Sequence, residues 1–184
     1  MSGDRSLYID RGVLLNLCAT GYVGDILKAL PFRCTILDDV CQSPLMLWTN
    51  PQEDEGLLEH ERVSIASLVS SGVLEVEHFE QERYRQAFVA FASYIPDRQA
   101  ALLTLAEQLH ATLAVDDKHT RRALDRLAPY IPIQSTLSCL YIWHVDLQLL
   151  DAQMQPILRN MAYQAQFTPP DGDPFLDWWQ RIVR

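Results

Sequence analysis

The chain has 184 residues, a hydrophobic fraction of 48% and a formal net charge of −9. This length and composition predict one globular domain of ordinary size and exclude a disordered polypeptide. No apolar run reaches the roughly 18 residues that a membrane span needs, and the N-terminus "MSGDRSLYID" lacks a signal-peptide pattern, so we expect a cytoplasmic protein with no membrane partner. The acidic charge argues against broad, salt-driven attachment to nucleic acid.

Strand-like and helix-like segments alternate along the chain. The pattern predicts a strand at 6–10, a helix at 12–30, a strand at 32–39, a loop at 50–56, a helix at 57–72, a strand at 73–79, helices at 80–95 and 97–111, a strand at 112–115, a helix from 118, a strand at 130–134, and helices at 135–150 and 154–166.

Such alternation predicts a mostly parallel sheet with helices on both faces, which is a three-layer α/β/α sandwich. We expect one domain over residues 1–166. Residues 167–184 form a C-terminal tail, which we expect to be a loop followed by a short helix.

Three of the expected strands end in carboxylates: Asp10, the pair Asp38 and Asp39, and the pair Asp116 and Asp117. A parallel sheet carries all of them to one edge, where ligands of such sheets bind. Clustered carboxylates repel each other unless a hard cation holds them, and oxygen ligands suit Mg²⁺ and Mn²⁺. The alternative interpretation of each Asp is a cap for the following helix.

Three short motifs resemble the PIN domains, and more narrowly the prokaryotic PIN-like group related to the toxins of toxin–antitoxin pairs. They are "YIDRGVLLNL", "VDDKHTRRAL" and "IPIQSTLSCL", and the resemblance covers roughly residues 7–166 in matching order and spacing. It implies an α/β/α sandwich and a Mg²⁺- or Mn²⁺-dependent ribonuclease site built from acidic residues.

The resemblance assigns site residues to the first and the last acid positions of the family. The first family acid matches Asp10, and the last matches Asp117 with Asp116 beside it. The resemblance therefore implies Asp10, Asp116 and Asp117 as catalytic residues, with Asp10 and Asp117 as metal ligands. The small polar pair after the last strand matches Ser135 and Thr136, which would line the site.

Two family acids are replaced by amides in this chain. Gln42 stands near the second acid position and Gln99 stands at the third. A glutamine can coordinate a cation through its carbonyl oxygen but brings no charge, so the site is partly degraded and metal binding should be weak. Asp39 and Asp97 lie a few residues from these positions and are candidate replacement acids.

A basic run follows the last carboxylates. Lys118, Arg121 and Arg122 share about one helix face with Arg126 and are candidates for steering an RNA backbone towards the site. The alternative is an ordinary solvated face, because Asp125 interrupts the run.

The cysteines and the C-terminal tryptophans complete the candidate features. Four cysteines without a CxxC pair predict buried free thiols. Because adjacent residues cannot both point inward from one helix face, Trp178 and Trp179 suggest a contact with a partner or a second copy. A small antitoxin-like partner and a homodimer are also implied by the resemblance.

Two functions remain open from the sequence. The first is a metal-dependent endoribonuclease with a weakened acidic site. The second is a catalytically silent PIN-like protein that binds a protein or RNA partner. The number of carboxylates that meet at the sheet edge separates them, and two amides in acid positions favour the second.

Overall fold

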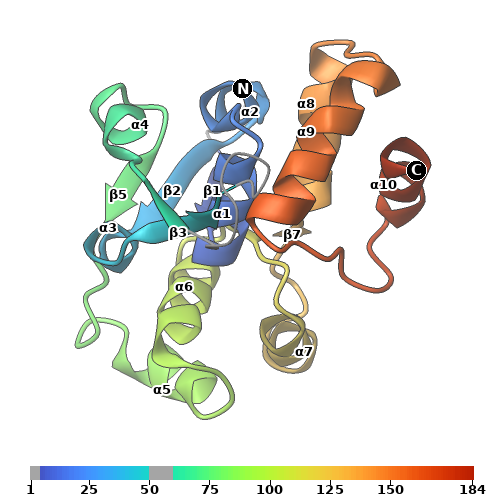
Figure 1. Cartoon of the computed structure of the whole chain (residues 1–184). Helices are drawn as coiled ribbons and strands as arrows, with labels where there is room; N and C mark the ends of the chain where they lie inside the picture. Colours follow the sequence, from blue (N-terminus) through green and yellow to red (C-terminus); the bar gives the residue numbers. More distant parts are fainter. Residues whose placement is uncertain (1–4, 50–59) are drawn as a thin grey trace.

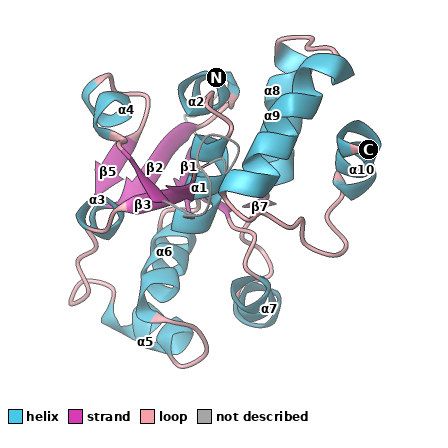
Figure 2. Ribbon diagram, viewed as in Figure 1, coloured by secondary structure: helices cyan, strands magenta, loops and turns pink. Residues whose placement is uncertain are grey.

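Five parallel strands form the central sheet in the order β5-β2-β1-β6-β7 (Figures 1 and 2). The computed structural model describes residues 5–49 and 60–184. The strands are β1 (Ser6–Ile9), β2 (Arg33–Leu37), β5 (Glu75–Glu77), β6 (Thr112–Ala114) and β7 (Ile133–Gln134).

Helices cover both faces of this sheet. Figure 1 shows α1, α2, α8 and α9 on one side, and α5, α6 and α7 on the other. The helices are α1 (Arg11–Ala19), α2 (Val23–Ala29), α3 (Asp38–Gln42), α4 (Ala66–Ser70), α5 (Arg85–Ala92), α6 (Asp97–Gln108), α7 (Lys118–Leu127), α8 (Thr136–Asp146), α9 (Asp151–Gln164) and α10 (Leu176–Val183). The predicted three-layer α/β/α fold with a mostly parallel sheet is confirmed.

Alternating side chains of the strands supply two separate cores. In β1, Leu7 and Ile9 are buried against the helices of the α1 side, while Tyr8 is buried against α5 and α6. This is the period-2 pattern of a strand that is buried on both faces. β1, whose last three residues are buried, lies at the centre of the sheet, and the residue that follows it lies at the sheet edge.

The structure corrects two predicted helices. The helix expected at 12–30 is interrupted near Gly21, whose φ of 77° lies in the left-handed region that glycine tolerates. The segment expected as a helix at 57–72 contains β4 (His60–Val63), and α4 follows it. β4 pairs antiparallel with β3 (Leu45–Trp48), a strand that we did not predict. The expected loop at 50–56 lies outside the described residues.

The C-terminal tail packs against the domain. After α9 the chain runs through turns to α10, and Arg159 of α9 donates hydrogen bonds to the carbonyl oxygen of Val183 at 3.0–3.1 Å. Trp178 and Trp179 are both buried in the same core as α1 and α8. The inference that they cannot both point inward was wrong. The domain boundary at residue 166 stays a prediction.

The cysteine prediction holds for three of four residues. Cys18, Cys34 and Cys139 are buried free thiols, whereas Cys41 on α3 is exposed. No helix in the described part of the chain is long and apolar enough to cross a membrane.

Candidate functional site

The carboxyl ends of β2, β1 and β6 lie side by side, because these three strands are neighbours in the sheet and run parallel. Asp38 follows β2, Asp10 follows β1, and Asp116 comes two residues after β6. This edge of the sheet is where a doubly covered parallel fold binds its ligands. The structure therefore places the candidate acids at one edge, in two groups.

Asp10 is the central acid and caps α1. Its side chain accepts a hydrogen bond of 2.9 Å from the backbone N–H of Gly12 and is only 8% exposed. A Cβ at Gly12 would lie 3.1 Å from the Asp10 carboxylate, so glycine permits this close turn. Burial raises the pKa of Asp10, the backbone hydrogen bonds oppose that rise, and the charges of Asp116 and Asp117 add to it.

Asp116 is held by three donors. It accepts hydrogen bonds from the backbone N–H of Thr136 at 3.0 Å, from the Thr136 hydroxyl, and from the Asn16 amide at 3.2 Å. Asn16 also donates to the Thr136 hydroxyl at 3.1 Å, which closes a network between α1, the end of β6 and the start of α8. Burial raises the pKa of Asp116, and the Thr136 hydrogen bonds lower it.

Asp117 and Ser135 cap the next two helices. Asp117 accepts from both the backbone N–H and the hydroxyl of Thr120 at 2.7 Å, which begins α7. Ser135 accepts from the backbone N–H of Ser138 at 3.0 Å and begins α8. The capping role weighed for the post-strand acids therefore applies to Asp10 and Asp117.

Arg121 points towards the carboxylates. Its Nε donates to the carbonyl oxygen of Val115 at 3.0 Å, and its guanidinium lies 3.7 Å from Asp116 and 3.9 Å from Asp173. Asp173 is buried, and its Oδ2 has no hydrogen-bond partner among the described residues. The predicted steering residue is thus engaged within the protein, as a counter-charge to two carboxylates.

Lys118 and Arg122 are exposed and line a cavity of about 690 Å³ beside the carboxylates. Its opposite wall is the tail segment that follows α9, including Gln166 and Thr168. Arg126, in contrast, lies over the ring of Tyr94 at 5.0 Å. The basic run is therefore divided, and only its first turns border the acidic edge.

The remaining candidates line a separate cavity of about 540 Å³ on the β2 side. Asp39, Asp97 and Gln99 all border it. Asp39 forms an ion pair with Arg98, and Asp38 lies 2.7 Å from His78. These residues border this cavity instead of the one beside Asp116 and Asp117.

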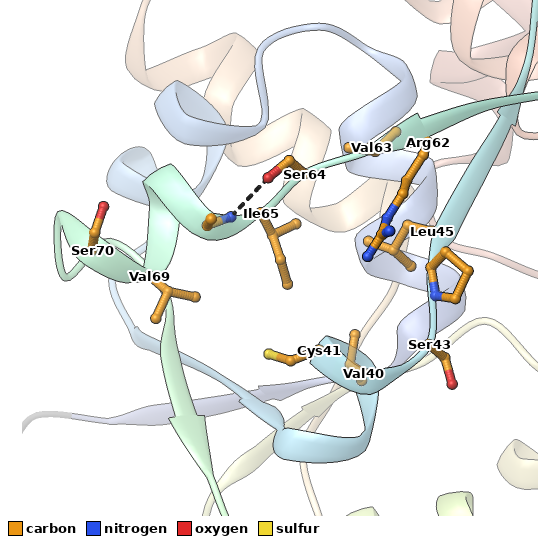
Figure 3. A pocket seen from close by; sticks show the side chains of 12 residues that line it. Val40, Cys41, Ser43, Leu45, Arg62, Val63, Ser64, Ile65, Val69 and Ser70 are labelled. Atoms are coloured by element: carbon orange, nitrogen blue, oxygen red, sulfur yellow. Dashed lines mark hydrogen bonds between the residues drawn. The ribbon is translucent and has the colours of Figure 1, made fainter.

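The second family acid position shows no carboxylate. Gln42 is exposed in the last turn of α3. The next residue, Ser43, borders a third cavity of about 610 Å³ between α3, α4 and the β3–β4 pair, where Arg62 and Cys41 stand among apolar side chains (Figure 3). The lining residues of this cavity include no acid. It is not part of the carboxylate edge.

A divalent cation would need several oxygen ligands that converge on one point. Within residues 5–49 and 60–184, no group of three or more His, Cys, Asp or Glu side chains is placed to hold a metal ion. Asp116 is occupied by Thr136 and Asn16, Asp117 caps α7, and Asp39 is paired with Arg98. As arranged, the donor set does not fit a Mg²⁺ or Mn²⁺ site.

Sequence reasoning missed Asn16 and Asp173. Asn16 carried a signal, because it is a polar residue within the apolar run "GVLLNLCA" of α1. Asp173 carried no such signal, because it lies in an irregular tail segment and is separated from Arg121 along the chain by α8 and α9.

In comparisons with known proteins, no protein-family model, curated protein or solved structure matches the chain.

Proposed function

We propose that this chain is a PIN-like protein that binds single-stranded RNA at the carboxyl edge of its sheet without cutting it. The proposal rests on which charged side chains at this edge have partners within the protein. The carboxylates are engaged by donors of the protein, whereas Lys118 and Arg122 have no acidic partner within ion-pair distance in the described part of the chain.

Unpaired cations beside a cavity favour an anionic ligand. Lys118 and Arg122 stand in the first two turns of α7 and border the cavity that also reaches Asp116. An RNA phosphate can pair with both of them. Asp125 and Asp171 border the same cavity, and the net charge is −9, so the binding should be weak and sensitive to salt.

The proposal is tested by fluorescence anisotropy of a labelled single-stranded RNA, titrated with the protein in EDTA at several salt concentrations. Lys118→Ala and Arg122→Ala should each weaken binding and flatten the log–log salt dependence by roughly 0.7 for each phosphate that the variant no longer neutralises. Arg126 belongs to the same helix, but its guanidinium stacks on Tyr94. Arg126→Ala should therefore leave the slope of the salt dependence unchanged. Equal slopes for all proteins would refute the proposal.

A metal-dependent endoribonuclease is the second candidate, and one observation favours it. The charges of Asp116 and Asp117 raise the pKa of Asp10, so three carboxylates lie within electrostatic reach at this edge. Cleavage of the same RNA with Mn²⁺ that is lost in both Asp10→Asn and Asp117→Asn would establish the nuclease. Binding without cleavage at any Mn²⁺ concentration would leave the binding function.

An antitoxin-like partner and a homodimer stay predictions from the resemblance. Size-exclusion chromatography with light scattering would decide the oligomeric state.

A further inference from the structure

We propose that the cavity between α3, α4 and the β3–β4 pair binds a medium-chain aliphatic carboxylate, with the chain inside the cavity and the carboxylate at Arg62. We call this cavity the Arg62 pocket. It shares no lining residue with the cavity beside α7. The proposal is therefore independent of RNA binding.

Apolar side chains form most of the Arg62 pocket. Val40, Leu45 and Ile65 are almost fully buried, and Val63 and Val69 are half-buried, so the apolar surface of the cavity continues from the core. Figure 3 shows Ile65 and Val69 pointing into the open space. The volume of about 610 Å³ and the mostly apolar lining are typical of small-molecule sites. Such a surface favours a ligand with an aliphatic chain, because burial of each methylene is favourable.

The thiol of Cys41 extends this apolar surface. Cys41 lies on α3, is exposed and borders the pocket. Partial burial raises the pKa of this thiol, and the charges of Asp38 and Asp39 add to the rise. The thiol therefore stays protonated at neutral pH and behaves as a small, nearly apolar group. Among the described residues that line the pocket, only Arg62 is charged.

Arg62 supplies a free cation at the opening. Its side chain is exposed and extends from β4 towards the cavity (Figure 3). In the described part of the chain, no carboxylate lies within ion-pair distance of it. A guanidinium can pair with both oxygens of a carboxylate. An unpaired guanidinium at the mouth of an apolar cavity is therefore suited to an anionic head group.

A second cation lies close to the same opening. Arg11 donates a hydrogen bond of 2.6 Å to the carbonyl oxygen of Pro44, which also lines the pocket. Within residues 5–49 and 60–184, Arg11 has no ion pair either. The net charge of the chain is −9, so this positive region contrasts with the protein as a whole. The contrast favours an anionic amphiphile over a cationic one.

The first test uses Cys41 as a reporter, because a chain bound in the Arg62 pocket covers its thiol. The whole protein is treated with N-ethylmaleimide in the presence of octanoate, hexanoate or octanol, and alkylation is followed by intact mass spectrometry. Octanoate should slow the reaction of Cys41. It should bind roughly fifteenfold more tightly than hexanoate, because each of its two additional methylenes strengthens binding about fourfold. Failure of octanoate to protect Cys41 would overturn the proposal.

The second test separates the head group from the chain. Arg62→Met keeps the length of the side chain and removes the cation, so it should weaken octanoate by about fivefold and leave octanol unchanged. Arg85→Met removes an exposed arginine of α5 that does not border the pocket and should alter neither ligand. Equal losses for octanoate and octanol in Arg62→Met would refute the role of Arg62.

The third test fills the cavity. Ala66 of α4 is exposed and lines the pocket, so Ala66→Trp should abolish the protection of Cys41 by both ligands. Thermal melting verifies that the variant folds. Protection that survives Ala66→Trp would show association outside the cavity and would contradict the proposal. Protection by a short peptide with a C-terminal leucine, but not by octanoate, would assign the pocket to a protein terminus and likewise overturn it.

Discussion

Thr136 donates two hydrogen bonds to Asp116, one from its backbone N–H and one from its hydroxyl, although the residues are twenty positions apart in the chain. The same hydroxyl accepts a hydrogen bond from Asn16. Thr136 is fully buried, so this contact fixes the orientation of the Asp116 carboxylate at the sheet edge. The polar residue after the last strand acts here as a donor to the acid that follows β6.

Removal of the Thr136 hydroxyl should destabilise the fold. Thr136→Val keeps the shape of the side chain but leaves Asp116 and Asn16 with one partner fewer, which costs about 1–3 kcal/mol for buried polar groups. Urea unfolding measures the loss. Thr136→Ser retains the hydroxyl and should lose less, and a valine variant as stable as the wild type would contradict the assigned network.

Replacement of Asp10 should flatten the dependence of stability on pH. The pKa of Asp10 is raised in the folded protein, chiefly by burial. Above the ordinary aspartate value the folded state therefore holds more protons than the unfolded state, and stability falls as pH rises through the folded pKa. Asp10→Asn keeps an oxygen that can accept from Gly12 and removes the buried charge.

Urea unfolding of the wild type and of Asp10→Asn, from about pH 4 to pH 7, isolates this effect. Both proteins contain the same remaining acids, so the titration of those acids cancels in the difference. The stability of the variant relative to the wild type should increase with pH. A constant difference would show that the Asp10 carboxyl titrates alike in the folded and unfolded chains.

Replacement of Arg121 should destabilise the fold more than replacement of its exposed neighbour Arg122. Arg121→Met removes the guanidinium that lies 3.7 Å from Asp116 and 3.9 Å from the buried carboxylate of Asp173. Loss of one partner of a fully buried pair costs about 3–5 kcal/mol. Because the Arg121 side chain is 24% exposed, we expect about 2–3 kcal/mol by urea unfolding.

A double-mutant cycle separates the Asp173 contact from the rest. Asp173→Asn combined with Arg121→Met should recover part of the loss, because no buried charge then remains at residue 173. Arg122→Met alters an exposed cation of the same helix and should change stability by less than about 0.5 kcal/mol. Additive losses in the cycle would show that Arg121 and Asp173 do not interact.

Cys41 should be the first cysteine to react with a thiol reagent. It is exposed, whereas burial raises the pKa of Cys18 and Cys34 to about 12 and Cys139 is fully buried. Titration with a disulfide reagent should consume one thiol in the folded protein and four in urea. Cys41→Ser should abolish the fast reaction, and fast reaction of more than one thiol would contradict the placement of these residues.

The sequence predicted the layers of this fold because burial leaves a clear pattern. β1, β2 and β6 were predicted from short apolar runs that lead into aspartate, but their order in the sheet was not predicted. β3 and β4 were missed because β4 exposes most of its side chains, so its residues do not alternate between apolar and polar. Local patterns predict strands that are buried on both faces and say little about a short antiparallel pair in which one strand is largely exposed.

The tryptophan pair shows a second limit of local reasoning. Trp178 packs edge-on against Tyr141 and His144 of α8, while Trp179 packs against Phe167. Neighbours on a helix point about 100° apart, but α10 meets the body of the protein on two sides. A helix that packs against several elements can bury both residues.

The candidate site was predicted as far as the sheet edge and no further. The placement of Asp10, Asp116 and Asp117 at one edge followed from the expectation of a parallel sheet, which brings the carboxyl ends of its strands together. Their partners did not, because the contacts of Asp116 with Thr136 and of Arg121 with Asp173 join distant parts of the chain. Which acids are free to bind a ligand is decided by those distant donors.

The pairing of β1 has a consequence for synthesis of the protein on the ribosome. On one side Leu7 pairs with Cys34, but on the other it pairs with Thr112. β1 therefore emerges early and keeps one backbone edge unpaired until β6 has been made. Such long-range parallel pairing forms slowly and leaves nascent chains prone to association. Slower translation should lengthen that exposure, and a chaperone that shields short apolar segments should raise the yield of folded protein.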